Sequence, residues 1–325
     1  MRLLLAVDSV TTLEILLNEI TARSWPEGTE ARVISIVEDG EVPLETWREE
    51  GYGVAAVRRE MLRRGEQITA LAINRLREIG IPAEVTVLRG TPEFLISFAA
   101  EQWSADMILI RAHNRTDFRN WMLGSVAQSV VDSAPCSVEV VRAKHEAPSV
   151  AANRSMRIVL ATDESDASLA AAQAVAKTNW PADTEVKVVS VVNPIIYSLE
   201  EIGVFGDKGT DRAHRAIGET LNVLRETPLK ISGELIAGRR ARQIIGRAKN
   251  WHADLIVLGS HHRRGLKRLP FGGTSAAVAK RAHCSVRVIR SASRNESLAH
   301  RSSPSIKNLG RVYRFEENHG WRRAA

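Results

Sequence analysis

Several features that mark common protein classes are missing from this 325-residue chain. Its two cysteines, Cys136 and Cys284, are too few for a disulfide framework, and we expect them to be small, buried apolar side chains. Apolar runs stay well below the roughly 18 residues of a membrane span, and Asp8 interrupts the first of them before any signal-peptide cleavage site. We therefore expect a cytoplasmic protein without a membrane segment.

Motifs of familiar enzymes are also absent. The chain has neither GxGxxG nor GxxxxGK[ST], and it has no GxSxG nucleophile elbow. The adjacent His261 and His262 have no cysteine or carboxylate at metal-ligand spacing. We predict no catalytic residue and no metal site.

An internal duplication organises the chain. Residues 101–115 match residues 249–263 at an offset of 148, and Asp8 matches Asp163 at an offset of 155. Self-similarity over such a distance indicates two copies of one structural unit. We predict a first domain at 1–142, a linker at 143–155, a second domain at 156–290 and a mostly disordered basic tail at 291–325.

Short runs of valine, isoleucine and leucine alternate with longer segments of helical spacing in each copy. Nearly continuous apolar runs are typical of strands covered on both faces, and this alternation predicts parallel βαβ units. We predict an α/β fold: two repeated five-stranded parallel-sheet domains, Rossmann-like, packed through their last strands as an intramolecular pseudo-dimer. The predicted strands are 2–7, 31–37, 83–88, 106–110 and 137–141 in the first copy, and 157–162, 185–192, 230–236, 254–258 and 285–289 in the second.

Polar and glycine-rich segments follow the strands of the second copy, at the edge where parallel sheets bind ligands. Gly272 and Gly273 allow close backbone approach, and Thr274 can cap the next helix so that its N–H groups point at an anion. Basic residues between 263 and 268 can neutralise phosphate. The residues alone equally fit a plain helix-start turn beside a solvated loop.

The segment "ADLIVLGSHHRRGLKRLPFGGTS" (253–275) resembles the signature of the universal stress protein family. Nucleotide-binding members carry Gly, two residues, Gly, nine residues, Gly, and then Ser or Thr. The resemblance extends over both copies and implies a five-stranded parallel domain of the adenine nucleotide alpha hydrolase-like type, often paired through its last strand. In ATP-binding members an aspartate after the first strand and a valine after the second help to form the adenine pocket.

Carried over residue by residue, the resemblance implies an adenine-nucleotide site in the second domain. Asp163 and Val191 fit the adenine side, and Gly259 begins the glycine signature. His262 replaces the second glycine, where a Cβ disfavours close backbone approach, and Gly273 takes the Ser/Thr place. Mg²⁺ is expected only as a companion of bound nucleotide. The predicted site consists of Ala161, Thr162, Asp163, Val191, Gly259, His262, Gly272, Gly273 and Thr274.

The first copy departs further from the signature. Asp8 and Ile36 fit the adenine side, and Gly124 ends the signature with a serine after it. However, Arg111 and Asn114 replace its first two glycines. We expect that this copy does not bind ATP in the manner of the family.

The resemblance implies a non-catalytic stress-response protein that binds ATP or another adenine nucleotide and changes how it meets a protein partner. Slow ATP hydrolysis is the most enzymatic activity that it leaves open. The alternative is an interaction module that no longer uses nucleotide, which the departures at His262 and Gly273 favour. The net charge of +7 permits anionic partners, but with 5% aromatic residues and no stacking motif, nucleic acid is not indicated. Assembly into a further homodimer stays open.

Overall fold

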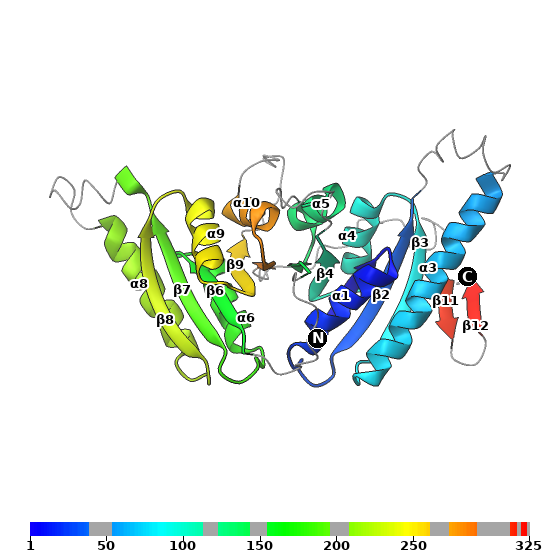
Figure 1. Ribbon diagram of the computed structural model, residues 1–325, viewed down its shortest axis with the longest axis horizontal. Coiled ribbons are helices and arrows are strands. Elements are labelled where there is room, and N and C mark those ends of the chain that lie inside the picture. The colour runs from blue at the N-terminus through cyan, green and yellow to red at the C-terminus, as the bar shows by residue number, and fades with distance from the viewer. Residues whose placement is uncertain are drawn as a thin grey trace, which may run out of the picture.

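Two repeated α/β units, coloured blue to green and green to orange in Figure 1, make up the protein. The computed structural model describes residues 1–38, 54–112, 123–143, 155–195, 208–260, 273–290, 313–316 and 320–323. The first unit contains β1 (Arg2–Val7), α1 (Val10–Thr21), β2 (Glu30–Val37), α3 (Val54–Glu78), β3 (Ala83–Arg89), α4 (Pro92–Gln102), β4 (Met107–Arg111), α5 (Ser125–Ser133) and β5 (Ser137–Val141). The second contains β6 (Arg157–Thr162), α6 (Asp166–Ala176), β7 (Glu185–Val192), α8 (Lys208–Leu224), β8 (Lys230–Ala237), α9 (Arg240–Asn250), β9 (Leu255–Ser260), α10 (Thr274–Arg281) and β10 (Ser285–Arg290).

All the strands belong to one sheet, and within each unit they run parallel. The sheet order is β8-β7-β6-β9-β10-β5-β4-β1-β2-β3, continued at the β3 edge by β11 (Tyr313–Glu316) and β12 (Gly320–Arg323). Every predicted strand of the two units is present, with ends that differ by at most two residues. Among the described strands, the two five-stranded halves of the sheet are joined by the antiparallel pair of β5 with β10, as the pseudo-dimer prediction requires.

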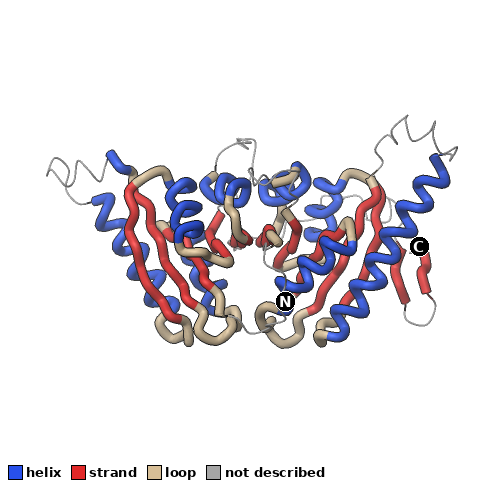
Figure 2. The backbone as a smooth tube through the Cα atoms, viewed as in Figure 1, coloured by secondary structure: helices blue, strands red, loops and turns tan. Residues whose placement is uncertain are grey.

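The strands form where they do because their consecutive apolar residues are buried on both faces of the sheet. Leu3, Leu4 and Leu5 are all fully buried, although neighbouring side chains of a strand point to opposite faces. Helices cover both faces (Figure 2). This arrangement explains why the strands read as continuous apolar runs rather than as alternating ones.

The two faces of the sheet have differently connected hydrophobic cores. On the face covered by α4, α5, α9 and α10, one cluster of buried side chains runs through both units. On the other face, α1 and α3 cover one cluster and α6 and α8 cover a separate one. Helices α5 and α10 lie side by side at the centre of Figure 1, so the shared core lies across the junction.

Two parts of the tail, which composition predicted to be mostly disordered, form a hairpin. Strand β11 pairs antiparallel with β3, Tyr313 opposite Val87, and β12 continues beyond it. The hairpin extends the edge of the first unit, as the red arrows of Figure 1 show. The aromatic and charged residues of "YRFE" alternate, which is a strand pattern that a composition argument misses.

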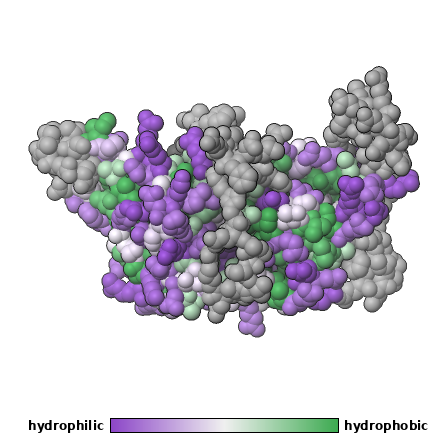
Figure 3. Space-filling view, viewed as in Figure 1, coloured by the Kyte–Doolittle hydropathy of each residue, from purple (hydrophilic) through white to green (hydrophobic). Residues whose placement is uncertain are grey.

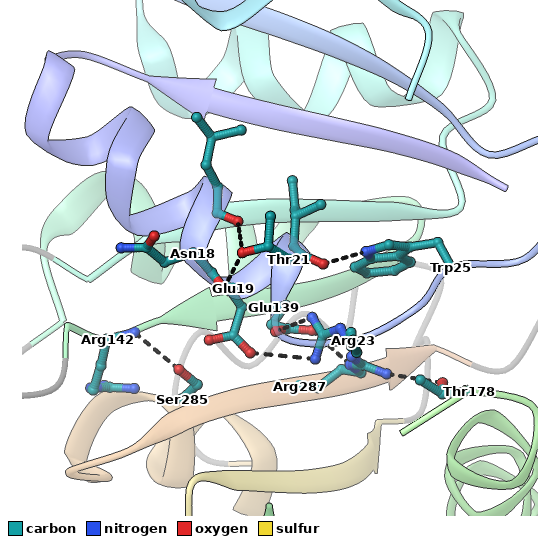
Figure 4. A network of polar contacts seen from close by, with 12 residues as sticks. Asn18, Glu19, Thr21, Arg23, Trp25, Glu139, Arg142, Thr178, Ser285 and Arg287 are labelled. Atoms are coloured by element: carbon teal, nitrogen blue, oxygen red, sulfur yellow. Dashed lines mark hydrogen bonds and ion pairs between the residues drawn. The ribbon is translucent and has the colours of Figure 1, made fainter. Parts of the chain in front are cut away.

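A buried ionic cluster lies at the junction of the units (Figure 4). Glu139 of β5 accepts from Arg23 Nη2 at 2.6 Å and from Arg287 Nε of β10 at 2.7 Å. All three side chains are at most 2% exposed. Burial acts to raise the pKa of Glu139, but the two guanidinium groups outweigh it and hold that pKa at about 2.

This shift predicts a specific acid sensitivity. A carboxylate whose folded-state pKa is about 2 stabilises the protein above its unfolded-state value of 4.5, and loses that contribution as the pH falls towards 2. The difference in free energy of unfolding between wild type and Glu139→Gln should therefore shrink over this range. Denaturant titrations at several pH values measure it, and a difference that stays constant with pH would contradict the assignment.

Hydrophilic side chains predominate among the described residues on the face shown in Figure 3, with hydrophobic patches on both halves. None of the described helices is both long enough and apolar enough to cross a membrane.

Candidate functional site

The residues predicted to hold adenine lie at the carboxyl ends of β6 and β7, but they point in different directions. Asp163 is exposed, and its Oδ1 accepts from the backbone N–H of Ser165 at 3.1 Å and from the Ser165 hydroxyl. Thr162 is buried and shares a hydrogen bond of 2.8 Å with Thr220 of α8. Ala161 and Val191 belong to the opposite face, in or against the core under α9 and α10. The Thr162 side chain therefore links the end of β6 to α8.

Gly259 has a structural reason to be glycine. A Cβ built at this position would lie 2.1 Å from the carbonyl oxygen of Ala167 and 2.7 Å from the backbone nitrogen of Ser168. The first turn of α6 therefore rests directly on the end of β9. The family resemblance places this glycine at the start of the nucleotide signature, and in the structure its missing side chain makes room for a helix.

The phosphate side of the second domain is described only in part. Gly273 is exposed and precedes α10 as its N-cap, without a side-chain cap hydrogen bond. Thr274 is the first residue of that helix, and Ser275 Oγ donates to Ser260 Oγ of β9 at 3.2 Å. This serine pair was missed by sequence reasoning. His262, Gly272 and the basic residues 263–268 lie outside the described residues.

A cavity of about 430 Å³ lies at the equivalent place in the first domain. It opens at the carboxyl ends of β1, β2 and β4, where α4 and α5 begin. Its wall is apolar, with Ile34, Ile36, Ile96 and Ile110 among the lining residues. The cavity was not expected, because the loss of the first two signature glycines outweighed the fit of Asp8, Ile36 and Gly124 in the sequence analysis.

One end of the cavity is suited to an anion. Arg111 lines it, and the single hydrogen bond of its guanidinium that lies within the described ranges runs from Nη1 to Thr12 Oγ1 at 3.4 Å. The Nε of Arg111 is buried without a partner among the described residues. Gly124 is the N-cap of α5 and provides no side-chain cap, so the first N–H groups of that helix face the same space.

The other polar side chains of the cavity are two carboxylates and two hydroxyls. Asp8 Oδ1 accepts from Thr12 Oγ1 at 2.6 Å and from Ser9 Oγ at 3.0 Å, and Glu38 also lines the cavity. These bonds hold the Asp8 carboxylate at the first turn of α1. The site thus combines an apolar wall, a cationic end and carboxylates able to accept from hydroxyl or amino groups.

Cys136 carries an unactivated thiol. Burial raises the pKa of Cys136 to about 12, so its thiol stays protonated near neutral pH. Cys284 is buried, and neither cysteine forms a disulfide. Within the described ranges no three His, Cys, Asp or Glu side chains gather as metal ligands.

Comparison with known proteins decides the family. A model of the universal stress protein family matches residues 1–142 and again residues 155–290. The chain is a tandem member of the universal stress protein family. Its two matches coincide with the two α/β units, so the duplication of this universal stress protein is a duplication of the whole family domain.

Individual relatives agree with that assignment. Universal stress protein MJ0531 of Methanocaldococcus jannaschii is 31% identical over 142 residues, which are 42% of this chain and 84% of the relative. A universal stress protein from Archaeoglobus fulgidus DSM 4304 is similar in structure, with a TM-score of 0.62 and 20% identity, over 89% of this chain and 96% of that one. Protein PA1789 of Pseudomonas aeruginosa PAO1 has a TM-score of 0.55 and 14% identity, over 89% and 92%. The last two likenesses concern the fold.

Proposed function

We propose that this universal stress protein binds ATP or another adenine nucleotide without consuming it, and that occupancy alters its contacts with a protein partner. The cavity of the first domain is the observation that carries the proposal. Its volume of about 430 Å³ is that of a small-molecule site, and it opens at the sheet edge where open parallel sheets bind ligands.

Each part of a nucleotide has a suitable counterpart in this cavity. The isoleucine wall offers an apolar surface to a base, and Asp8 can accept hydrogen bonds from ribose hydroxyls. Arg111 and the N-terminus of α5 offer donors and positive potential to phosphate. Mg²⁺ would enter only with the nucleotide.

The second domain remains the site predicted from the signature. Asp163 is exposed at its edge, and Gly273 leaves the first N–H groups of α10 without a side-chain cap. Against it stands the contact between Gly259 and the backbone of α6, which gives this glycine a role without any ligand. Geometry therefore favours the first domain.

Calorimetric titration with ATP tests the proposal on a matched pair of variants. Ile36 and Val191 occupy the same position in the two copies, and each packs against the core at the carboxyl end of its strand. We expect wild type to bind ATP, Ile36→Trp to bind at least about tenfold more weakly, since it fills the cavity, and Val191→Trp to bind like wild type. Thermal unfolding of each variant checks that the fold is kept.

The other outcomes of the titration distinguish a second-domain site from the absence of nucleotide binding. Weakening by Val191→Trp but not by Ile36→Trp would keep nucleotide binding and assign it to the second domain. No binding by wild type, with or without Mg²⁺, would contradict the proposal and favour the nucleotide-independent interaction module.

A further inference from the structure

The backbone contacts between the two domains follow a two-fold axis. In the antiparallel pair of β5 and β10, Glu139 lies opposite Arg287, and these two residues hold the same position in the two copies. The backbone N–H of Ser24 donates to the carbonyl of Asn179 at 3.2 Å, and these positions also correspond. The junction is therefore built like that of a symmetric homodimer, with its axis at the pair Glu139–Arg287.

Side chains away from the axis keep this symmetry. Arg142 follows β5 and donates from Nη2 to the carbonyl of Ala279 in α10 of the other domain. Its counterpart Arg290 donates from Nη2 to the carbonyl of Val131 in α5 at 2.6 Å. Ala279 and Val131 are again equivalent positions. Each domain thus holds a helix of the other by the same arginine contact.

At the axis itself the symmetry is broken by charge. Arg23 of the first domain corresponds to Thr178 of the second, and the carboxylate of Glu139 corresponds to the guanidinium of Arg287 (Figure 4). The first domain therefore contributes Glu139 and Arg23, with Glu19 at 3.4 Å from Arg23. To this cluster the second domain contributes the buried cation Arg287, and none of its described residues contributes a carboxylate there.

We infer that Arg287 and Glu139 determine which domain pairs with which, so that β10 accepts the acidic β5 and rejects a second copy of itself. If β10 paired with β10 of another chain in the same register, two Arg287 guanidinium groups would meet at the axis. Among the described residues of the second domain, Thr178, at 3.5 Å from Arg287 Nη1, and the ring of Trp180 would contact them, and neither carries a negative charge. Burying two like charges without a counter-ion is strongly unfavourable.

This selectivity matters because the chain has two such surfaces. Pairing of the first domain with the second closes the molecule, and no pairing edge is left at the centre of the sheet. Pairing of like domains between chains would leave the other domain of each chain unpaired, and repetition would build open assemblies. The charge difference therefore makes the two domains of one chain pair with each other, so that this interface does not join separate chains.

The test compares two substitutions of one residue in the full-length chain. Arg287→Lys keeps a positive charge at the axis, whereas Arg287→Met has similar length and no charge. Each protein is unfolded in denaturant and refolded at increasing concentration, and its mass is measured by light scattering after gel filtration. We expect Arg287→Met to form at least about tenfold more oligomer than Arg287→Lys, which should behave like wild type.

The oligomer fractions of these variants can also contradict the inference. Equal oligomer fractions for the two variants would overturn the inference, because the charge at position 287 would then make no difference to assembly. If Arg287→Met fails to refold, the triple variant Arg23→Leu/Glu139→Val/Arg287→Val replaces it, since no buried charge of the triad is then unpaired. A triple variant that folds and stays monomeric at every concentration would also overturn the inference.

Discussion

Replacing Gly259 by alanine is expected to destabilise the protein by about 3 kcal/mol or more. The new Cβ would lie 2.1 Å from the carbonyl oxygen and 2.2 Å from the carbonyl carbon of Ala167, and both atoms belong to the backbone of α6. A backbone contact cannot be relieved by a rotamer change, so the helix must move away from β9. Denaturant unfolding of the variant measures the loss.

Gly246→Ala is the matched control. This glycine lies inside α9, and a Cβ there would meet no atom within 4 Å, so alanine should stabilise the protein by about 0.5–1 kcal/mol through its better helix propensity. Equal stability of Gly259→Ala and wild type would show that α6 does not rest on β9, and would leave the nucleotide signature as the reason for a glycine at this position.

Truncating Glu139 to alanine is expected to cost about 3–5 kcal/mol, because it leaves two arginines in the core of the junction. Arg287 would lose its only carboxylate partner among the described residues, and Arg23 would keep only Glu19 at 3.4 Å. The indole rings of Trp25 and Trp180, 4.7 and 5.2 Å from the guanidinium carbons of Arg23 and Arg287, would not replace a counter-ion.

Glu60→Ala provides the comparison at the surface. Glu60 pairs with Arg63 and Arg64 on α3, but these side chains are 41 to 71% exposed, so solvent screens the interaction and little change is expected. Chemical unfolding of both variants gives the two values. A loss for Glu139→Ala as small as that for Glu60→Ala would mean that the junction hydrates when the carboxylate is removed.

The strands and the pairing of the two domains could be predicted from the sequence because their signals are local or repeated. Apolar runs such as "LLLAV" and "IVLAT" fix strands covered on both faces, and the duplication itself suggested a dimer-like junction. The charge cluster at that junction could not be predicted. Its three residues lie far apart in the chain, and they come together only in the strand register that places Glu139 opposite Arg287.

The candidate site was harder to predict because glycine has more than one use. Gly259 matched a ligand signature, yet its backbone is covered by α6, and the signature alone does not distinguish these roles. In the first domain, Arg111 counted as a lost glycine, although its guanidinium lies at a cavity beside the N-terminus of α5. The position of the neighbouring helix determines whether a residue that replaces a signature glycine blocks the ligand site or lines it.

Hydrogen exchange of the wild-type protein with and without ATP tests the central claim most directly. Ligand phosphates at the first turn of α5 would engage the backbone N–H groups of Ser125, Val126 and Ala127, which line the cavity. The account predicts slower exchange of these amides when ATP is present. Unchanged exchange at this turn, at saturating ATP, would contradict the assignment of the first-domain cavity as a nucleotide site.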